Sequence, residues 1–383
     1  MCPNAFFVPA PAVGPDSASR GPRPEGRPPE HRLLFLFEKG KFMEYAKIWF
    51  VLWAVLWTGY LALDGFDLGV GFSGWLAARG EEERRHVFSS IGPFWDGNEV
   101  WLVTAGGATF AAFPPVYAAL FSWLYPALLL ILFSLIARGV SLEFRGKVQS
   151  AAWKSFWERT TAVSSFLTAL LFGVAFGNIF RGLQIGVEGY TGTFFGLLNP
   201  YSLLTGLLFC AFFFFHGQLW LSFKTTGPVS ARAVKLAGRA WYVLTLLFIV
   251  FAASSYYYTG LSGNFIVRNS LLALPVLLAA ALIAAKALLS IGLRGSAFLA
   301  SFSAIVLFML TGFAGIYPAL LPSRIDPAFS LTVYDSASGV YTLKLMTLAA
   351  LVLLPVVIGC QLWVHRLFRV PLTADELNKS GMY

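Results

Sequence analysis

Apolar stretches of roughly 20 residues recur nine times between residues 46 and 367, and no long polar segment separates them. Because about 20 helical residues cross the hydrocarbon core of a bilayer, each stretch predicts a transmembrane helix. Only 12% of the 383 residues are charged, about half the fraction typical of soluble domains. We expect an all-α polytopic membrane protein with spans at about 46–76, 94–112, 118–138, 160–180, 201–223, 237–258, 270–292, 297–318 and 340–366.

Lysine and arginine are distributed unequally between the two sides of these spans. Positive residues stay on the cytoplasmic side of short loops, so the N-terminus is predicted outside and the C-terminus in the cytoplasm. The net charge of +9 comes from basic residues that follow the membrane topology. No stretch interleaves basic and aromatic residues as nucleic-acid-binding surfaces do. No nucleic-acid partner is expected. The outer side carries Lys47, Arg181, Arg268 and Arg324. The cytoplasmic side carries Arg79, Arg84, Arg85, Arg138, Arg145, Lys147, Lys154, Arg159, Lys224, Arg232, Lys235, Arg239, Arg294, Arg366, Arg369 and Lys379.

Residues 1–42 differ from the rest of the chain because they are rich in Pro, Arg and Gly. Such a composition buries too little apolar surface to become ordered, which predicts a disordered N-terminal extension before a membrane domain at 43–383. Met43 directly precedes the first span, and the positive charges of the extension would lie outside, against the usual rule. We therefore expect translation to start at Met43, with the extension a start-site artefact.

The end of the first span carries two acids, Asp64 and Asp67, three residues apart and so on one helical face. Ionisable groups in spans are expensive and indicate function by default. Small residues surround them and allow another helix to approach closely, which predicts that the carboxylates face protein instead of lipid. These small residues are Gly65, Gly69, Gly71 and Gly74.

The second span opens with another pair of acids, Asp96 and Glu99, flanked by Trp95 and Trp101. The alternative interpretation of Asp96 is a first-turn charge, which the helix dipole favours.

The alternating direction of the spans brings the acids to one depth. The first span reaches the inner side near Asp64, the second starts there, and the third ends there with Arg138 and Glu143. A group of interacting acids around one arginine can take up and pass protons near pH 7. The alternative is a structural ion-pair network that only holds the helices together.

His216 lies well inside a predicted span, whereas His365 lies at the inner end of the last one, where a solvated or interfacial position is expected. A haem held between two helices needs two axial side chains, so this chain alone is not expected to bind haem. We expect a hydrogen bond from His216 within the bundle instead. Cys2, Cys210 and Cys360 share no metal-binding spacing, so neither a metal site nor a disulfide framework is expected.

Several stretches resemble subunit II of the cytochrome bd quinol oxidases. The most specific are Leu63-Asp64-Gly65-Phe66-Asp67-Leu68-Gly69-Val70-Gly71, the segment from Gly92 to Trp101, and the segment from Gly106 to Tyr117. Residues 174–178, 197–200 and 330–336 match as well. The resemblance extends from about Met43 to the C-terminus.

The resemblance implies two four-helix bundles plus a peripheral helix in a bacterial or archaeal cytoplasmic membrane. It also implies a partner, subunit I, that carries haems b and d and the quinol site. The complex would oxidise quinol and reduce oxygen to water with protons from the cytoplasm, and this chain alone would not be catalytic. A small single-helix subunit, membrane lipid and a structural quinone are further partners compatible with the family.

The resemblance also implies roles for individual residues. Asp96 becomes the principal carboxylate of a proton path, supported by Trp95, Asp64, Asp67 and Arg138, with Glu99 in the same cluster. Trp101, Gly106 and Gly107 become candidates for the border of an apolar oxygen path. Two other functions stay open. Embedded carboxylates beside Gly-interrupted helices also describe a proton-coupled transporter or channel, and the chain could serve only as a structural scaffold.

Overall fold

The computed structural model describes residues 29–371, with side chains described from Gly40 onward. Eight helices in this part are long and apolar enough to cross a membrane, and a ninth span is formed if the bent pair α3 and α4 is counted as one. The predicted nine-span helical membrane fold is therefore confirmed for the described residues. The helices are α1 (Pro29–Ala77), α3 (Trp95–Ala112), α4 (Pro114–Trp123), α5 (Tyr125–Phe144), α6 (Ala151–Arg181), α7 (Pro200–Lys224), α8 (Gly227–Tyr258), α10 (Ala273–Ser290), α11 (Arg294–Ile316) and α13 (Val340–Leu367).

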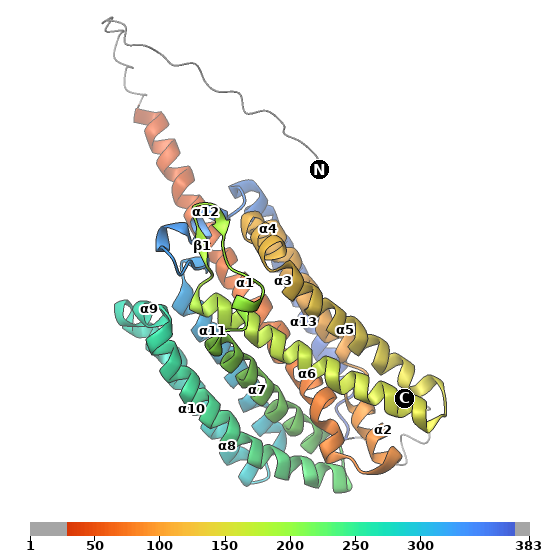
Figure 1. The fold of residues 1–383 in the computed structure, drawn as a ribbon. Coiled ribbons are helices and arrows are strands. Elements are labelled where there is room, and N and C mark those ends of the chain that lie inside the picture. The colour runs from red at the N-terminus through yellow and green to blue at the C-terminus, as the bar shows by residue number, and fades with distance from the viewer. Residues whose placement is uncertain (1–28, 372–383) are drawn as a thin grey trace, which may run out of the picture.

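The helix α1 begins earlier than predicted. It starts at Pro29 and runs without a break through Met43, so residues 29–42 are helical where the sequence predicts a disordered extension. The apolar run at 33–37 explains this difference, because it favours helix within an otherwise Pro-rich and Arg-rich segment. In Figure 1, α1 extends beyond the other helices. The remainder of the predicted extension, residues 1–28, lies outside the described part of the chain.

The second and third predicted spans are joined by a sharp bend. The axes of α3 and α4 differ by 119°, with Phe113 in a non-helical conformation between them. Pro114 and Pro115 cause the break, since proline disfavours helix in the residue before it and donates no backbone hydrogen bond. The third span accordingly begins at Tyr125, where the sequence places it at 118.

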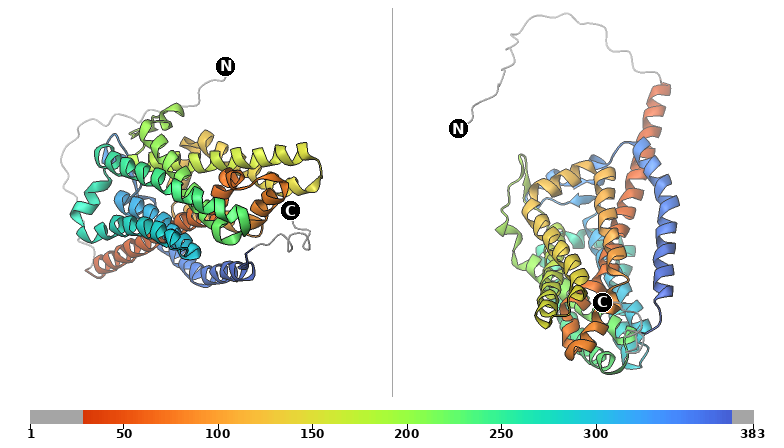
Figure 2. Two further views of the ribbon diagram at one scale, coloured as in Figure 1. Left: turned by 90° about the horizontal axis from the view of Figure 1, so that it is seen from below. Right: turned by 90° about the vertical axis from the view of Figure 1, so that its right-hand side faces the viewer.

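Two groups of helices pack side by side. The first contains α1, α3, α5 and α6, and the second contains α7, α8, α10 and α11, with α7 packed against both α1 and α6. The helix α13 is peripheral, because it packs mainly along α1 and α3 and its span-forming residues are exposed. Figure 2 shows α13, in blue, running beside α1 at the edge of the molecule.

Glycine allows α1 and α7 to approach closely. A Cβ on Gly69 would collide with the backbone carbonyl oxygen of Phe213, and one on Gly217 would lie 2.5 Å from the backbone nitrogen of Val70. A Cβ on Gly65 would lie 2.8 Å from the Phe213 ring. The predicted close helix approach is confirmed at Gly65 and Gly69.

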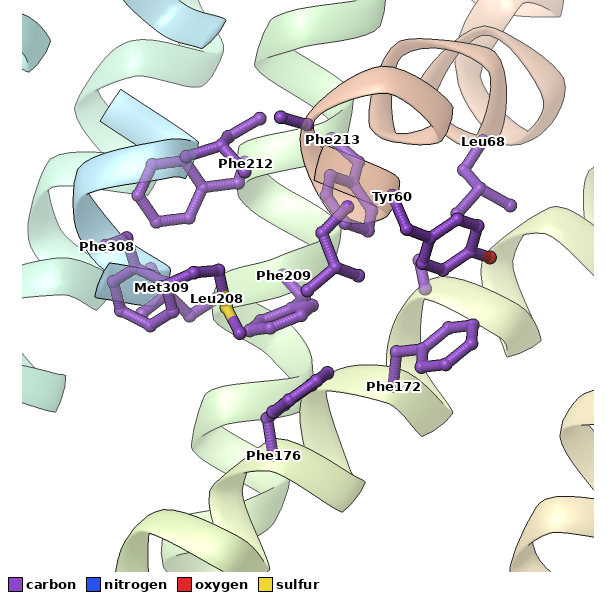
Figure 3. Packing of buried hydrophobic residues seen from close by; sticks show 14 of the residues in the cluster. Tyr60, Leu68, Phe172, Phe176, Leu208, Phe209, Phe212, Phe213, Phe308 and Met309 are labelled. Atoms are coloured by element: carbon purple, nitrogen blue, oxygen red, sulfur yellow. The ribbon is translucent and has the colours of Figure 1, made fainter. Parts of the chain in front are cut away.

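Aromatic side chains fill the space between the two groups of helices (Figure 3). Phe176 of α6 stacks on Phe209 of α7, with ring centroids 6.0 Å apart, and Phe209 meets Phe213 edge-on at 5.6 Å. Tyr60 of α1 packs edge-on against Phe172 at 5.2 Å.

The two ends of the molecule differ in structure. One end, here called the α2 end, carries the short helix α2 (Gly80–Ile91) and η1 (Arg145–Lys147). The opposite end, the hairpin end, carries two small antiparallel pairs, β1 with β2 and β3 with β4. Its elements are β1 (Ile185–Gly186), β2 (Gly189–Tyr190), η2 (Phe195–Leu197), α9 (Leu261–Val267), η3 (Asn269–Leu272), β3 (Ala319–Leu321), η4 (Pro327–Phe329), β4 (Leu331–Thr332) and α12 (Val333–Ser336).

Candidate functional site

A buried ion pair links α1 to α5. Arg138 donates through Nη1 to Asp64 Oδ2 at 2.7 Å and through Nη2 to Asp64 Oδ1 at 2.6 Å. Both side chains are completely buried. Two parallel charge-assisted hydrogen bonds fix the carboxylate and the guanidinium relative to each other.

Glu99 of α3 approaches the same arginine from the other side. Its Oε1 lies 3.6 Å from Arg138 Nη1, which is an ion-pair distance but too long for a hydrogen bond. About a quarter of the Glu99 side chain is exposed (24%), whereas Asp64 and Arg138 are 0% exposed. Glu99 thus lies at the boundary between the buried pair and the surface.

A second chain of hydrogen bonds starts from Asp67. Asn98 Nδ2 donates to Asp67 Oδ2 at 2.6 Å and to the carbonyl oxygen of Leu63 at 3.3 Å. Gln361 of the peripheral α13 donates from Nε2 to Asn98 Oδ1 at 2.5 Å. The acids of α1 are therefore connected through α3 to α13.

The cluster has more negative groups than positive ones. Among the described residues, Arg138 pairs with two carboxylates, those of Asp64 and Glu99, while the third acid, Asp67, accepts from the uncharged amide of Asn98. Asp67 Oδ1 and the buried hydroxyl of Tyr60 make no hydrogen bond within the described part of the chain. Proton uptake by the cluster would bring it closer to neutrality, which burial favours.

The sequence-predicted residues Asp96, Trp95 and Glu143 lie outside this buried cluster. Asp96 is in the first turn of α3 with its side chain exposed, and no hydrogen bond or ion pair holds it within the described residues. Trp95 packs against α5, since a Cβ on Gly139 would lie 3.3 Å from its ring. Glu143 is exposed near the end of α5.

Asn98 and Gln361 belong to the site although sequence reasoning did not select them. Asn98 stands between Asp96 and Glu99 in the second acidic motif, and Gln361 is an isolated amide in an otherwise apolar span. Both amides were visible as polar groups in spans, and that signal could have identified them.

A separate ion-pair network lies at the α2 end. Arg145 donates from Nη2 to Glu158 at 2.7 Å and to Glu81 at 3.1 Å. Arg84 donates to Glu158 at 3.0 Å, and Lys154 Nζ lies 2.9 Å from Glu81. This network joins α2, η1 and α6.

An apolar groove of about 470 Å³ runs between α1, α3 and α13. Trp101 and Gly107 line it, together with Trp49 and aliphatic residues of α13. Gly106 does not line the groove, although a Cβ there would also meet no atom within 4 Å.

His216 is fully buried and hydrogen-bonded inside the second helix group. Its Nδ1 lies 3.1 Å from Ser301 Oγ, and its ring stacks on Phe298 with centroids 4.3 Å apart. The predicted hydrogen bond of His216 is confirmed. Among residues 29–371, no three His, Cys, Asp or Glu side chains are grouped so that they could hold a metal ion.

Comparison with protein families and known proteins gives consistent matches. The family model described as cytochrome bd terminal oxidase subunit II matches residues 45–368. Cytochrome bd ubiquinol oxidase subunit 2 of Bacillus subtilis is 36% identical over 337 residues, which are 86% of this chain and 97% of that protein. Cytochrome bd-I ubiquinol oxidase subunit 2 of Escherichia coli is 31% identical over 367 residues, covering 87% and 96% of the two chains.

A solved structure shares the fold. The bd oxidase structure from Geobacillus thermodenitrificans superimposes with a TM-score of 0.69 at 16% identity, covering 85% of this chain and 98% of that one.

Proposed function

Because the chain belongs to the family of cytochrome bd terminal oxidase subunit II, and is a subunit of a quinol oxidase complex of aerobic respiration, we propose that it supplies a proton path to that complex. The complex of this family contains haem and acts on quinol and oxygen. In the proposal, this chain also supports the haem-bearing subunit I. The single observation that carries the proton path is a group of three carboxylates with one arginine, in which Asp64 and Glu99 pair with Arg138 and the buried Asp67 accepts from Asn98.

Side-chain exposure decreases stepwise from the α2 end into the protein. Asp96 is exposed, Glu99 one turn further along α3 is one-quarter exposed, and Asp67 is completely buried. A proton that enters from water needs such a sequence of acceptors to reach the interior. We assign Asp96 as the principal carboxylate at the entrance, and Glu99 and Asp67 as the acceptors that follow.

The two acids of α1 have different roles in this proposal. Both oxygens of Asp64 accept hydrogen bonds from Arg138, so Asp64 holds the arginine in position. Asp67 accepts from Asn98 with one oxygen, and its other oxygen remains available to accept a proton. Arg138 limits the repulsion between the acids, and Trp95 closes the contact between α3 and α5.

Aromatic rings cover the histidines of two membrane helices. Phe298 stacks on the ring of His216 with centroids 4.3 Å apart. His365 of α13 stacks on Phe94 with centroids 4.7 Å apart. We propose that haems b and d are bound by subunit I. The role that we propose for this chain is the delivery of protons.

The positive-inside rule makes the α2 end the cytoplasmic end of the proposed complex. Arg84, Arg145 and Lys154 lie in the ion-pair network there, and Arg232 of α8 pairs with Glu83 of α2. Protons entering at Asp96 would then come from the cytoplasm of a bacterium or archaeon.

The groove between α1, α3 and α13 is a second candidate path, in this case for oxygen. Its lining is apolar, which suits a small neutral molecule, and Trp101 and Gly107 border it as proposed. The test is the oxygen affinity of the Trp101→Ala complex. A changed affinity supports the path, and an unchanged affinity contradicts it.

The experiment for the proton path measures quinol-dependent oxygen uptake by the purified complex beside its haem spectrum. Asp96→Asn, Glu99→Gln and Asp67→Asn are expected to retain the haems and lose about tenfold or more of the uptake. Glu143→Gln is the matched control, because Glu143 is an exposed acid outside the cluster. If none of the three changes affects oxygen uptake, the proton path is contradicted and only a structural role as a scaffold remains.

The alternative of a proton-coupled carrier or channel is distinguished by purification. A carrier would be active alone or as a homo-oligomer without a chromophore. A bd oxidase subunit is expected to copurify with a partner chain and with haem absorbance.

A further inference from the structure

A groove of about 440 Å³ at the α2 end lies between α1, α2 and α6, away from the acidic cluster. It is lined by Val70, Gly71, Trp75, Ala78, Arg84, Val87, Phe88, Ile91, Ser155, Glu158, Arg159, Ala162 and Val163. None of these residues takes part in the proposed proton or oxygen paths.

The groove has an apolar half and a polar half. On α6, Ala162 and Val163 lie about one turn further from the α2 end than Arg159 and about two turns further than Ser155. On α1, Val70 and Gly71 likewise lie further from the α2 end than Trp75, and Ala78 directly follows the helix. The charged residues of the lining therefore lie at the end of the spans, beside apolar residues of α2, and the lining toward the middle of the spans is apolar.

The polar half carries excess positive charge. Arg84 and Glu158 pair at 3.0 Å, and Glu158 is shared with Arg145 at 2.7 Å. Arg159 is exposed and has no acidic partner within the described residues. The charge that remains uncompensated at this end of the groove is that of an arginine.

The groove opens on the outer surface of the helices, which faces the membrane. Val163 and Trp75 are 59% and 60% exposed, and Trp75 lies in the last turn of α1. Tryptophan is enriched at the boundary between hydrocarbon and headgroups. The polar half of the groove is thus expected at headgroup level, with the apolar half at the level of the acyl chains.

We propose that this groove binds a phospholipid with an anionic headgroup. The headgroup phosphate lies against Arg159 and Arg84, and one acyl chain lies along Val70, Ala162 and Val163. Basic pockets between membrane helices on the cytoplasmic side recognise anionic lipids by this chemistry. The inference is independent of the proton path, because it concerns different residues and a different face.

The test measures lipid binding to the intact complex by native mass spectrometry, with phosphatidylglycerol and phosphatidylcholine as probes. Wild type is expected to bind phosphatidylglycerol more tightly. Arg159→Gln is expected to weaken phosphatidylglycerol binding about fivefold and leave phosphatidylcholine unchanged, since one basic residue contributes that much near a lipid headgroup. Arg239→Gln, which removes an exposed arginine of α8 outside the groove, is the matched control.

A second variant tests the apolar half. Ala162→Phe places a ring in the groove and is expected to remove the bound lipid with Arg159 intact. The proposal is overturned by equal affinity of wild type for the two lipids, or by equal effects of Arg159→Gln and Arg239→Gln. Inorganic phosphate that binds as well as the lipid, and is unaffected by Ala162→Phe, would also overturn it in favour of a free-anion site.

Discussion

Arg138 binds both carboxylate oxygens of Asp64, at 2.7 and 2.6 Å, and neither side chain has any exposed surface. The pair joins α5 to α1 in the first helix group. The attraction within a buried ion pair adds little net stability, because both charges had to leave water. Removal of one partner costs more stability, because the other charge stays buried without it.

Single substitutions of this pair are expected to destabilise the complex more than the double substitution. Asp64→Leu or Arg138→Met should each cost about 3–5 kcal/mol, since each removes both hydrogen bonds from the remaining buried charge. Asp64→Leu combined with Arg138→Met should cost less than either. The measurement is a double-mutant cycle on thermal unfolding of the purified complex. Additive effects would contradict direct coupling of the two residues.

Gly69 is expected to tolerate no larger residue. In Gly69→Ala the new Cβ would overlap the backbone carbonyl of Phe213, and backbone cannot move aside as a flexible side chain does. We expect a loss of about 1–3 kcal/mol or failure to assemble. Gly359→Ala on α13, where a Cβ meets nothing within 4 Å, is the control and should keep or slightly raise stability. Thermal unfolding and yield of the complex measure both variants, and equal stability of the two would contradict the close contact.

The sequence predicted the spans and most of the buried cluster for one physical reason. Alternating helix direction and expensive charges together place Asp64, Asp67, Glu99 and Arg138 at one depth. The depth of a residue in the membrane does not show which side of its helix faces the protein. The sequence therefore could not predict that Asp96 is exposed while Glu99, three residues later, is partly buried.

The packing of the last helix was also beyond the sequence. The span-forming residues of α13 are almost uniformly apolar, so their pattern does not indicate which side meets α1 and α3. Gln361 therefore had no predicted partner, although it donates to Asn98 at 2.5 Å.

Gln361 is expected to hold α13 against the acidic cluster. Gln361→Leu would leave the buried Asn98 Oδ1 without its donor, which should cost about 1–3 kcal/mol. Leu362→Ala, at a neighbouring side chain that is 65% exposed, should change stability by less than about 0.5 kcal/mol. Thermal unfolding of the complex distinguishes the two. If both variants unfold at the same temperature, the hydrogen bond does not anchor the helix.

Glu83 is expected to make stability depend on pH at the α2 end. Its carboxylate accepts from Arg232 of α8 and from the backbone N–H of Arg79. Burial opposes ionisation, but these hydrogen bonds outweigh it and lower the pKa of Glu83 from its usual 4.5. A lowered folded pKa means that the contribution is present above about pH 4.5 and is lost as pH falls through the folded value.

Glu83→Gln should therefore lower the unfolding temperature of the complex at pH 7 and lose this effect in acid. Solvent screens the pair, which limits the contribution to about 0.5 kcal/mol. Glu82→Gln is the control, because it removes an exposed acid from the same turn. Unfolding temperatures of wild type and the two variants, measured from pH 7 down to the lowest pH at which the complex stays folded, test this. A gap between wild type and Glu83→Gln that stays constant across the range would show that Glu83 contributes by packing and not by its charge.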